Sequence, residues 1–158
     1  NIVELGPGDG TLTNVLIRSF KKFPEFDLIK KIFLYEKSPY LKKIQKKNIT
    51  NKDIKWINNF KNIKKGPTIF FGNEFFDAIP IKQFRKTKND YFEKNYSLEN
   101  NYEIKEIFKK ASLKDVKKIK SYKSLKKLKF IEFPKLGFQE LKKIAKKNIK
   151  IEWMYFND

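Results

Sequence analysis

Three glycines between a strand-like and a helix-like segment constrain this chain more than any other feature. The loop runs from Glu4 to Thr11 (ELGPGDGT), after the apolar run Ile2–Leu5 and before residues 11–22, whose apolar residues have helical spacing. Glycine permits a tight turn and lets a ligand approach the backbone closely. A strand, a glycine loop and a helix in this order are typical of nucleotide-binding α/β units. The same pattern also fits an ordinary turn between a strand and a helix, with Thr11 as the helix cap.

The spacing of the glycines distinguishes between cofactors. In the dinucleotide fingerprint G-x-G-x-x-G, the helix N-terminus faces a pyrophosphate. Here the third glycine, Gly10, comes one residue earlier, and Glu4 stands two residues before the first glycine, Gly6. S-adenosylmethionine (SAM) has no phosphate but carries an ammonium group, with which a carboxylate can pair. The E-x-G-x-G-x-G pattern resembles the first motif of class I methyltransferases, so we expect Glu4, Gly6, Gly8 and Gly10 to bind SAM.

A second acidic residue supports a nucleotide site. Residues 32–35 form a buried strand-like run that ends at Glu36, where this fold places a carboxylate for ribose hydroxyls. The separation from the glycines exceeds the usual ~20 residues, and we expect residues 23–26 to absorb the extra length. Taken alone, Glu36 could equally be a surface carboxylate.

Strands and helices alternate along the first half of the chain. Further strand-like runs lie at 54–57 and 68–71, and Ser38-Pro39 opens a helix with Leu41 and Ile44 inward. This alternation predicts βαβ units with a parallel sheet. After residue 84 the pattern changes. We expect a β-hairpin insertion over 85–110, a lysine-dominated helix or loop over 112–129, and a helix over 138–147 with Leu141, Ile144 and Ala145 on one face.

Polar residues follow the fourth predicted strand. Ligands of open α/β sheets bind beyond the carboxyl ends of the strands, which places Asn73, Glu74 and Asp77 near the methyl donor. Phe75 and Phe76 could form the wall of a pocket. Alternatively, both phenylalanines are core residues and Glu74 caps a following helix.

Composition limits the chemistry. The chain has no cysteine and no histidine, which excludes disulfides, thiolate metal sites and Ser-His or Cys-His catalysis, and we expect no metal. Its net charge of +19 is compatible with nucleic-acid binding. However, Arg18 and Arg85 are the only arginines, which leaves 35 of the 37 basic residues as lysines. Since nucleic-acid sites usually recruit arginine, compositional drift toward A/T-rich codons is the other explanation.

The run from Asn73 to Pro80 (NEFFDAIP), followed by Gln83-Phe84, resembles the signature of the MidA family of SAM-dependent methyltransferases. The glycine loop, Glu36 with Ser38-Pro39, Trp56 and the later Glu132-Phe133-Pro134 segment fit the same family. The resemblance spans residues 1 to about 150, and the lysine-rich segment departs from it. It implies a Rossmann-like α/β class I methyltransferase domain, truncated at both ends, with an insertion after the fourth strand.

The resemblance also implies an activity. Mitochondrial members of the family are assembly factors of respiratory complex I and dimethylate an arginine of one of its subunits. We therefore expect SAM as cofactor and a protein arginine as substrate, with a subunit of respiratory NADH dehydrogenase as the candidate protein. Carboxylates suit a guanidinium because they accept its paired N–H donors. Glu74 is the first candidate for this role, Asp77 the second, and Asn73 completes the catalytic set.

This interpretation predicts a domain organisation and a location. The SAM-binding core covers 1–84, the insertion 85–130, and the return to the core 131–150. The compartment is the cytoplasm in a bacterium or the mitochondrial matrix in a eukaryote, without membrane insertion. Two alternatives stay open: an RNA or DNA methyltransferase, supported by the lysines, and a non-catalytic assembly partner with a SAM-type fold.

The last eight residues, 151–158, do not fit the family pattern of a glycine-bearing turn followed by an apolar strand. Back-translated with A/T-ending codons and shifted by one base, they encode Leu-Asn-Gly-Cys-Ile-Leu-Met, which does fit. We therefore hypothesise a frame slip near residue 150 and a non-native tail. A genuinely divergent terminus is the alternative, and resequencing of the encoding DNA decides between them.

Overall fold

A computed structural model describes residues 1–51, 53–100 and 102–146. The chain divides into two compact units, one formed by residues 1–78 together with the described residues 140–146, and the other by residues 79–139. The domain boundaries that were predicted from sequence at 84/85 and 130/131 stay a prediction. The proposed non-native tail, 151–158, lies outside the described residues.

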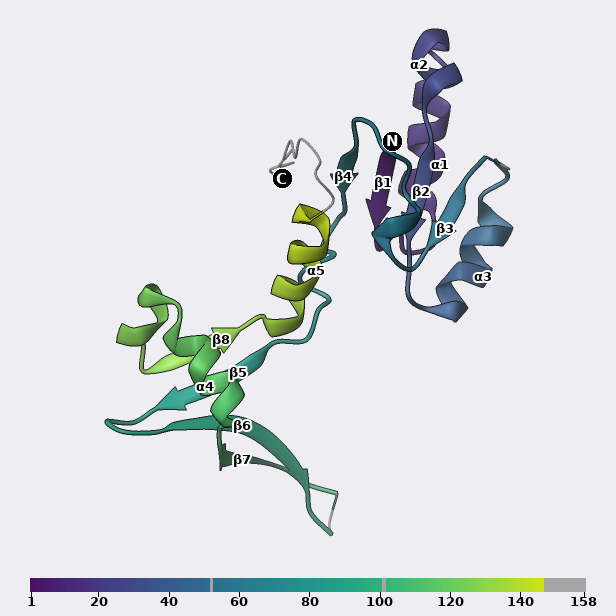
Figure 1. Cartoon of the computed structure of the whole chain (residues 1–158). Helices are drawn as coiled ribbons and strands as arrows, with labels where there is room; N and C mark the ends of the chain where they lie inside the picture. The colour runs from purple at the N-terminus through teal and green to yellow at the C-terminus, as the bar shows by residue number, and fades with distance from the viewer. Residues whose placement is uncertain (52, 101, 147–158) are drawn as a thin grey trace. The chain divides into compact units, whose positions relative to one another are not determined.

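The first unit is built on a four-stranded parallel sheet with strand order β3-β2-β1-β4 (Figure 1). Its elements in chain order are β1 (Ile2–Leu5), α1 (Thr11–Phe20), α2 (Pro24–Ile29), β2 (Ile32–Tyr35), α3 (Pro39–Asn48), β3 (Lys55–Ile57), the 3₁₀ turn η1 (Phe60–Asn62) and β4 (Ile69–Phe71). Parallel strands joined by helical crossovers confirm the α/β prediction. The carboxyl ends of β1 and β4 lie side by side, which brings the glycine loop next to the segment after β4.

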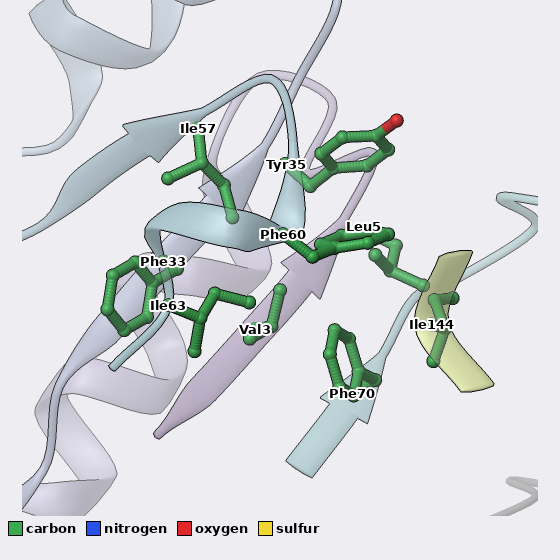
Figure 2. Close-up of a cluster of buried hydrophobic side chains, with 9 residues drawn as sticks. All are labelled: Val3, Leu5, Phe33, Tyr35, Ile57, Phe60, Ile63, Phe70 and Ile144. Atoms are coloured by element: carbon green, nitrogen blue, oxygen red, sulfur yellow. The ribbon is translucent and has the colours of Figure 1, made fainter. Parts of the chain in front are cut away.

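Both faces of this sheet are covered, as β2 illustrates. Its four residues are all buried and alternate between two clusters, because successive side chains of a strand point to opposite faces. Ile32 and Leu34 pack with Ile17 of α1. The cluster on the other face contains Val3, Leu5, Phe33, Tyr35, Ile57, Phe60, Ile63, Phe70 and Ile144 (Figure 2). Strands that are buried on both faces read as continuous apolar runs, which is why the sequence pattern located them.

Helix α1 differs from the prediction at both of its ends. Gly10, not Thr11, is the cap of α1, and the Thr11 amide donates to Asp9 Oδ1 at 2.9 Å. The helix also ends at Phe20, before the predicted Lys22. Part of the additional length between α1 and β2 forms the short helix α2. Helix α3 opens at Ser38-Pro39 as predicted, and Ser38 caps it by accepting from the Leu41 amide at 3.3 Å.

Helix α3 buries an unexpected residue. Leu41 and Ile44, predicted to face inward, are only partly buried, whereas Gln45 on the same face is completely buried. A buried amide is stable only when its hydrogen-bonding groups have partners. The partners of Gln45 are part of the candidate site described below.

The second unit is an antiparallel sheet with strand order β7-β6-β5-β8. Its elements are β5 (Lys82–Lys86), β6 (Tyr91–Leu98), β7 (Ile104–Lys110), α4 (Leu113–Lys120), the 3₁₀ turn η2 (Lys123–Lys127) and β8 (Phe130–Phe133). Strands β6 and β7 form a long hairpin (Figure 1), in agreement with the hairpin expected over 85–110. β5 and β8 extend this sheet, with Phe84 opposite Ile131. Both of these residues are fully buried, in a cluster that also contains Ile119 of α4.

The last described helix, α5 (Lys135–Ala145), begins three residues before the predicted start at Phe138. Ile144 is fully buried as expected, but Ala145 is exposed, so the predicted apolar face is wrong at that position. In the described part of the chain, no helix is long and apolar enough to cross a membrane.

Candidate cofactor-binding site

The three glycines of the β1–α1 loop all have positive φ angles, but their surroundings differ. A Cβ atom on Gly10 (φ 92°) would meet the Ile49 side chain at 2.7 Å, so this glycine allows α3 to pack against the start of α1. A Cβ on Gly8 (φ 57°) would meet no atom within 4 Å. Gly8 therefore presents its backbone to open space, as a loop that admits a ligand requires.

That open space is a cleft of about 980 Å³ between the glycine loop and the segment after β4. The lining residues are Glu4, Gly6, Pro7, Gly8, Asp9, Thr11, Leu12, Val15, Phe71, Gly72, Asn73, Glu74 and Asp77. Four of these 13 residues are acidic and none is basic, although the whole chain has 37 basic and 18 acidic residues. The charge of the lining is thus opposite to that of the protein, and the cleft suits a cationic ligand.

Glu4 is the buried carboxylate of the cleft. Only 3% of the residue is exposed, and Oε2 accepts a hydrogen bond from Thr13 Oγ1 at 2.5 Å. Burial raises the pKa of Glu4, and the hydrogen bond from Thr13 only partly opposes this effect. No described cation forms an ion pair with Glu4, so a bound ammonium group would stabilise its ionised form.

The other acidic residues of the cleft are exposed. The Thr11 amide donates to Asp9 and lowers the pKa of its carboxyl. Glu74 and Asp77 have no ion-pair partner among residues 1–51, 53–100 and 102–146. Glu74 has a φ of 50°, which is uncommon for a residue with a side chain and is often found at functional sites. No helix follows it directly, so the alternative that Glu74 caps a helix is wrong.

The two phenylalanines after β4 do not line the cleft. Phe75 packs against the buried cluster around Tyr35, with ring centroids 6.0 Å apart, and its ring lies 3.0 Å from where a Cβ of Gly6 would stand. Phe76 stacks edge-on against Phe75 and is 38% exposed. Neither phenylalanine is thus part of this cleft's lining, and the aromatic residue that lines it is Phe71 at the end of β4.

Glu36 and Gly10 also lie outside the lining. Glu36 directly follows β2 and is buried, with Oε1 accepting from the amides of Lys37 and Ser38, each at 2.8 Å. Its other oxygen, Oε2, accepts from Gln45 Nε2 at 3.2 Å. Glu36 thus has a fixed orientation beside the glycine loop.

Helix α3 holds the glycine loop in place through two amide side chains that sequence reasoning did not select. Gln45 Nε2 donates to the carbonyl of Gly8 at 2.8 Å, and Asn48 Nδ2 donates to the carbonyl of Asp9 at 3.0 Å. Residues three apart lie on one face of a helix. One feature of the sequence could have identified Gln45: it is a polar residue four positions after Leu41, on the helix face that was predicted to be apolar.

Another buried carboxylate, Glu140, connects α5 to the end of β2. Glu140 accepts from Tyr35 Oη at 2.7 Å, from Lys37 Nζ at 2.7 Å and from Lys143 Nζ at 2.8 Å. Although burial opposes ionisation, these hydrogen bonds lower the pKa of Glu140 to about 2. Glu132, part of the segment that resembles the family, instead accepts from Gln83 across the β5–β8 pair. No group of residues suited to hold a metal ion occurs in the described ranges.

The sequence model of a protein family described as "Putative S-adenosyl-L-methionine-dependent methyltransferase" matches residues 1–152. The chain belongs to this family. The match covers both compact units and confirms the family predicted from the run between Asn73 and Pro80.

Curated relatives of the chain are mitochondrial proteins named protein arginine methyltransferase NDUFAF7. The protein from Xenopus tropicalis is 32% identical over 118 residues, with 58% of this chain and 27% of the relative covered. The homolog from Caenorhabditis elegans is 32% identical over 112 residues, and the human protein is 27% identical over 118 residues. Each of these two matches covers 58% of this chain and 26% of the relative. The chain thus spans about a quarter of the length of these relatives.

Two solved structures of proteins from Burkholderia thailandensis have the same fold. One is described as bound to S-adenosyl-homocysteine. It has a TM-score of 0.67 and 14% sequence identity, and the match covers 91% of this chain and 38% of the solved chain. The other is a native structure with a TM-score of 0.68 and 14% sequence identity, and the match covers 91% of this chain and 39% of the solved chain. These structural similarities confirm the Rossmann-like methyltransferase fold that was predicted for this chain.

Proposed function

We propose that this chain belongs to a protein that transfers a methyl group from SAM to an arginine side chain of another protein. The observation that carries the proposal is the acidic lining of the cleft in a strongly basic chain. SAM contributes a sulfonium and an ammonium group, and arginine contributes a guanidinium. All three are cations, and a cleft with carboxylates and without lysines attracts them.

The cofactor lies along the glycine loop in this proposal. The ammonium group of SAM pairs with Glu4, whose buried carboxylate has no cationic partner among the described residues. The backbone at Gly8 leaves space for the ligand, and Glu36 accepts a hydrogen bond from the ribose. SAM supplies an activated methyl group on its sulfonium sulfur.

The substrate arginine is placed at Asn73, Glu74 and Asp77. One guanidinium nitrogen gives its proton to Glu74, and its electron pair attacks the methyl carbon. The carbon–sulfur bond breaks, its electrons remain on sulfur, and S-adenosyl-homocysteine is released. Methyl transfer mainly requires in-line placement of nitrogen and methyl group, which carboxylates that bind the guanidinium provide. This chemistry needs no histidine.

The relatives' names support a protein substrate and a mitochondrial location. For a eukaryotic source we propose the mitochondrial matrix, and for a bacterial source the cytoplasm, with a subunit of respiratory NADH dehydrogenase as the candidate partner. The acidic lining disfavours the alternative of an RNA or DNA methyltransferase because Glu74 and Asp77 would repel phosphates. A non-catalytic assembly partner is the second alternative, in which SAM binding persists without methyl transfer.

The deciding experiment incubates the intact parent protein with a cell lysate and SAM that carries a labelled methyl group. The proposal predicts label in protein, resistant to nuclease, sensitive to protease and recovered as methylarginine after hydrolysis. Label that nuclease removes would support the nucleic-acid alternative. Measurable SAM affinity without any labelled product would support the assembly partner.

A further inference from the structure

Gln45 occupies a central position between the two parts of the candidate cofactor site. Its side chain is fully buried in α3 and contacts three different elements. Nε2 donates to the Gly8 carbonyl at 2.8 Å and to Glu36 Oε2 at 3.2 Å, and Oε1 accepts from Trp56 Nε1 at 2.9 Å. One amide therefore links the glycine loop, the end of β2 and β3.

The chemistry of its partners fixes the orientation of this amide. An indole N–H can only donate a hydrogen bond, so Oε1 of Gln45 must face Trp56. The amide nitrogen then has to face Gly8 and Glu36, whose oxygens both accept. A flipped amide would lose all three hydrogen bonds, and each buried group left without a partner is costly.

Gln45 also limits how Glu36 can contact a ligand. A carboxylate has about four acceptor positions, two on each oxygen. The amides of Lys37 and Ser38 occupy Oε1, and Gln45 occupies one position on Oε2. One acceptor position remains, on Oε2, so Glu36 can accept from a single ribose hydroxyl at a time.

We infer that Gln45 is a positioning residue that holds Gly8 and Glu36 in register and thereby determines how strongly the site recognises the ribose of its cofactor. The inference rests on the proposed SAM site. Preorganised groups bind more tightly because no orientation has to be fixed on binding. Without Gln45, Oε2 has no fixed direction and the Gly8 carbonyl loses its buried donor, so the contribution of the ribose hydroxyls to affinity should fall.

The test uses the intact protein and two ligands, S-adenosyl-homocysteine and its analogue without ribose hydroxyls, measured by isothermal titration calorimetry. The ratio of the two affinities reports hydroxyl recognition. Gln45→Met keeps the length of the side chain but removes its hydrogen bonds. We expect this variant to bind S-adenosyl-homocysteine about tenfold or more weakly, in line with a lost hydrogen bond to a charged group. The dideoxy analogue should lose much less, so that the ratio shrinks.

Asn48→Ala is the matched control, because Asn48 holds the same loop from the same helix without contacting Glu36. Its affinity ratio should equal that of the wild type. A Gln45→Met variant that weakens both ligands equally, or neither, overturns the inference. If that variant shows no thermal unfolding transition, the two ligand affinities are measured with Gln45→Asn instead. Equal weakening of both ligands, or no weakening of either, then overturns the inference in the same way. Absence of binding to the wild type would instead contradict the proposed function.

Discussion

Replacement of Glu4 by glutamine should have opposite effects on ligand affinity and on stability. The substitution removes the charge but keeps the shape and an oxygen that can accept from Thr13. In the wild type the carboxylate is 3% exposed, so solvent screens its attraction to a bound ammonium group only weakly. A hydrogen bond to a charged group contributes about 1.5–3 kcal/mol. At about 1.4 kcal/mol per tenfold, Glu4→Gln should weaken SAM binding roughly 10- to 100-fold at pH 7.

The pH dependence provides a second, independent signature. Because burial raises the pKa of Glu4, protonation begins at a higher pH than for an exposed glutamate. SAM affinity of the wild type should therefore fall as the pH is lowered from 7 through this raised pKa, and the Glu4→Gln variant should lack this component. The sign for stability is reversed. A carboxyl whose pKa is raised by folding destabilises the folded state above that pKa, so Glu4→Gln should unfold at a higher temperature at pH 7.

Calorimetric titration at several pH values, with thermal melts of the ligand-free protein, measures both effects. Glu25→Gln on α2 is the control, since it changes an exposed glutamate outside the cleft. The reasoning would be refuted by an affinity loss below threefold, or by the same pH dependence in the wild type and the variant.

Three further perturbations test other parts of the site. Gly8→Val fills the open space above the loop and should abolish measurable SAM binding by calorimetry; unchanged affinity in a folded variant would remove the assignment of the loop. Glu74→Gln should lower labelled-methyl transfer by roughly 100-fold while SAM affinity stays within a few-fold, and a parallel loss of both would contradict the division of roles. The pKa of Glu140, about 2, lies below the 4.5 of an ordinary glutamate, so its contribution to stability is present above about pH 4.5 and lost as the pH falls toward 2. Urea unfolding over this pH range should show a smaller loss for Glu140→Gln than for the wild type, and identical pH profiles would contradict the role of this carboxylate.

The sequence predicted the first unit well because its two central strands, β1 and β2, are buried on both faces. Continuous apolar runs such as residues 32–35 stand out from their surroundings, and a glycine follows the runs that form β1 and β4. β5 shows the limit of this approach. Its sequence, KQFRK, contains one apolar residue, Phe84, and its partner β8 lies more than 40 residues further along the chain. Pairing over such a separation leaves no local pattern, so only the hairpin of this sheet was predicted.

At the candidate site, the sequence motif identified residues near the cleft but did not predict which of them face it. Glu4, Gly6 and Gly8 line the cleft together with Asn73, Glu74 and Asp77, whereas Gly10 faces Ile49 and Glu36 faces Gln45. A glycine spacing cannot distinguish a position that admits a ligand from one that admits a neighbouring helix. Gln45 was missed for a related reason. Helical periodicity identifies inward-facing residues by their hydrophobicity. It therefore overlooks a polar side chain such as Gln45, which is buried because three hydrogen bonds satisfy its amide.

The hydrogen bond between Trp56 and Gln45 gives the protein an intrinsic optical reporter. The indole of Trp56 lies one side chain away from the Gly8 carbonyl, and the Lys46 ammonium group stands 5.7 Å from its ring centroid. Tryptophan emission responds to the polarity and charge around the indole, so any rearrangement of the glycine loop that moves Gln45 should change the fluorescence of Trp56. With the remaining tryptophans of the protein replaced by phenylalanine, stopped-flow fluorescence would follow ligand entry in real time, without a label on either molecule.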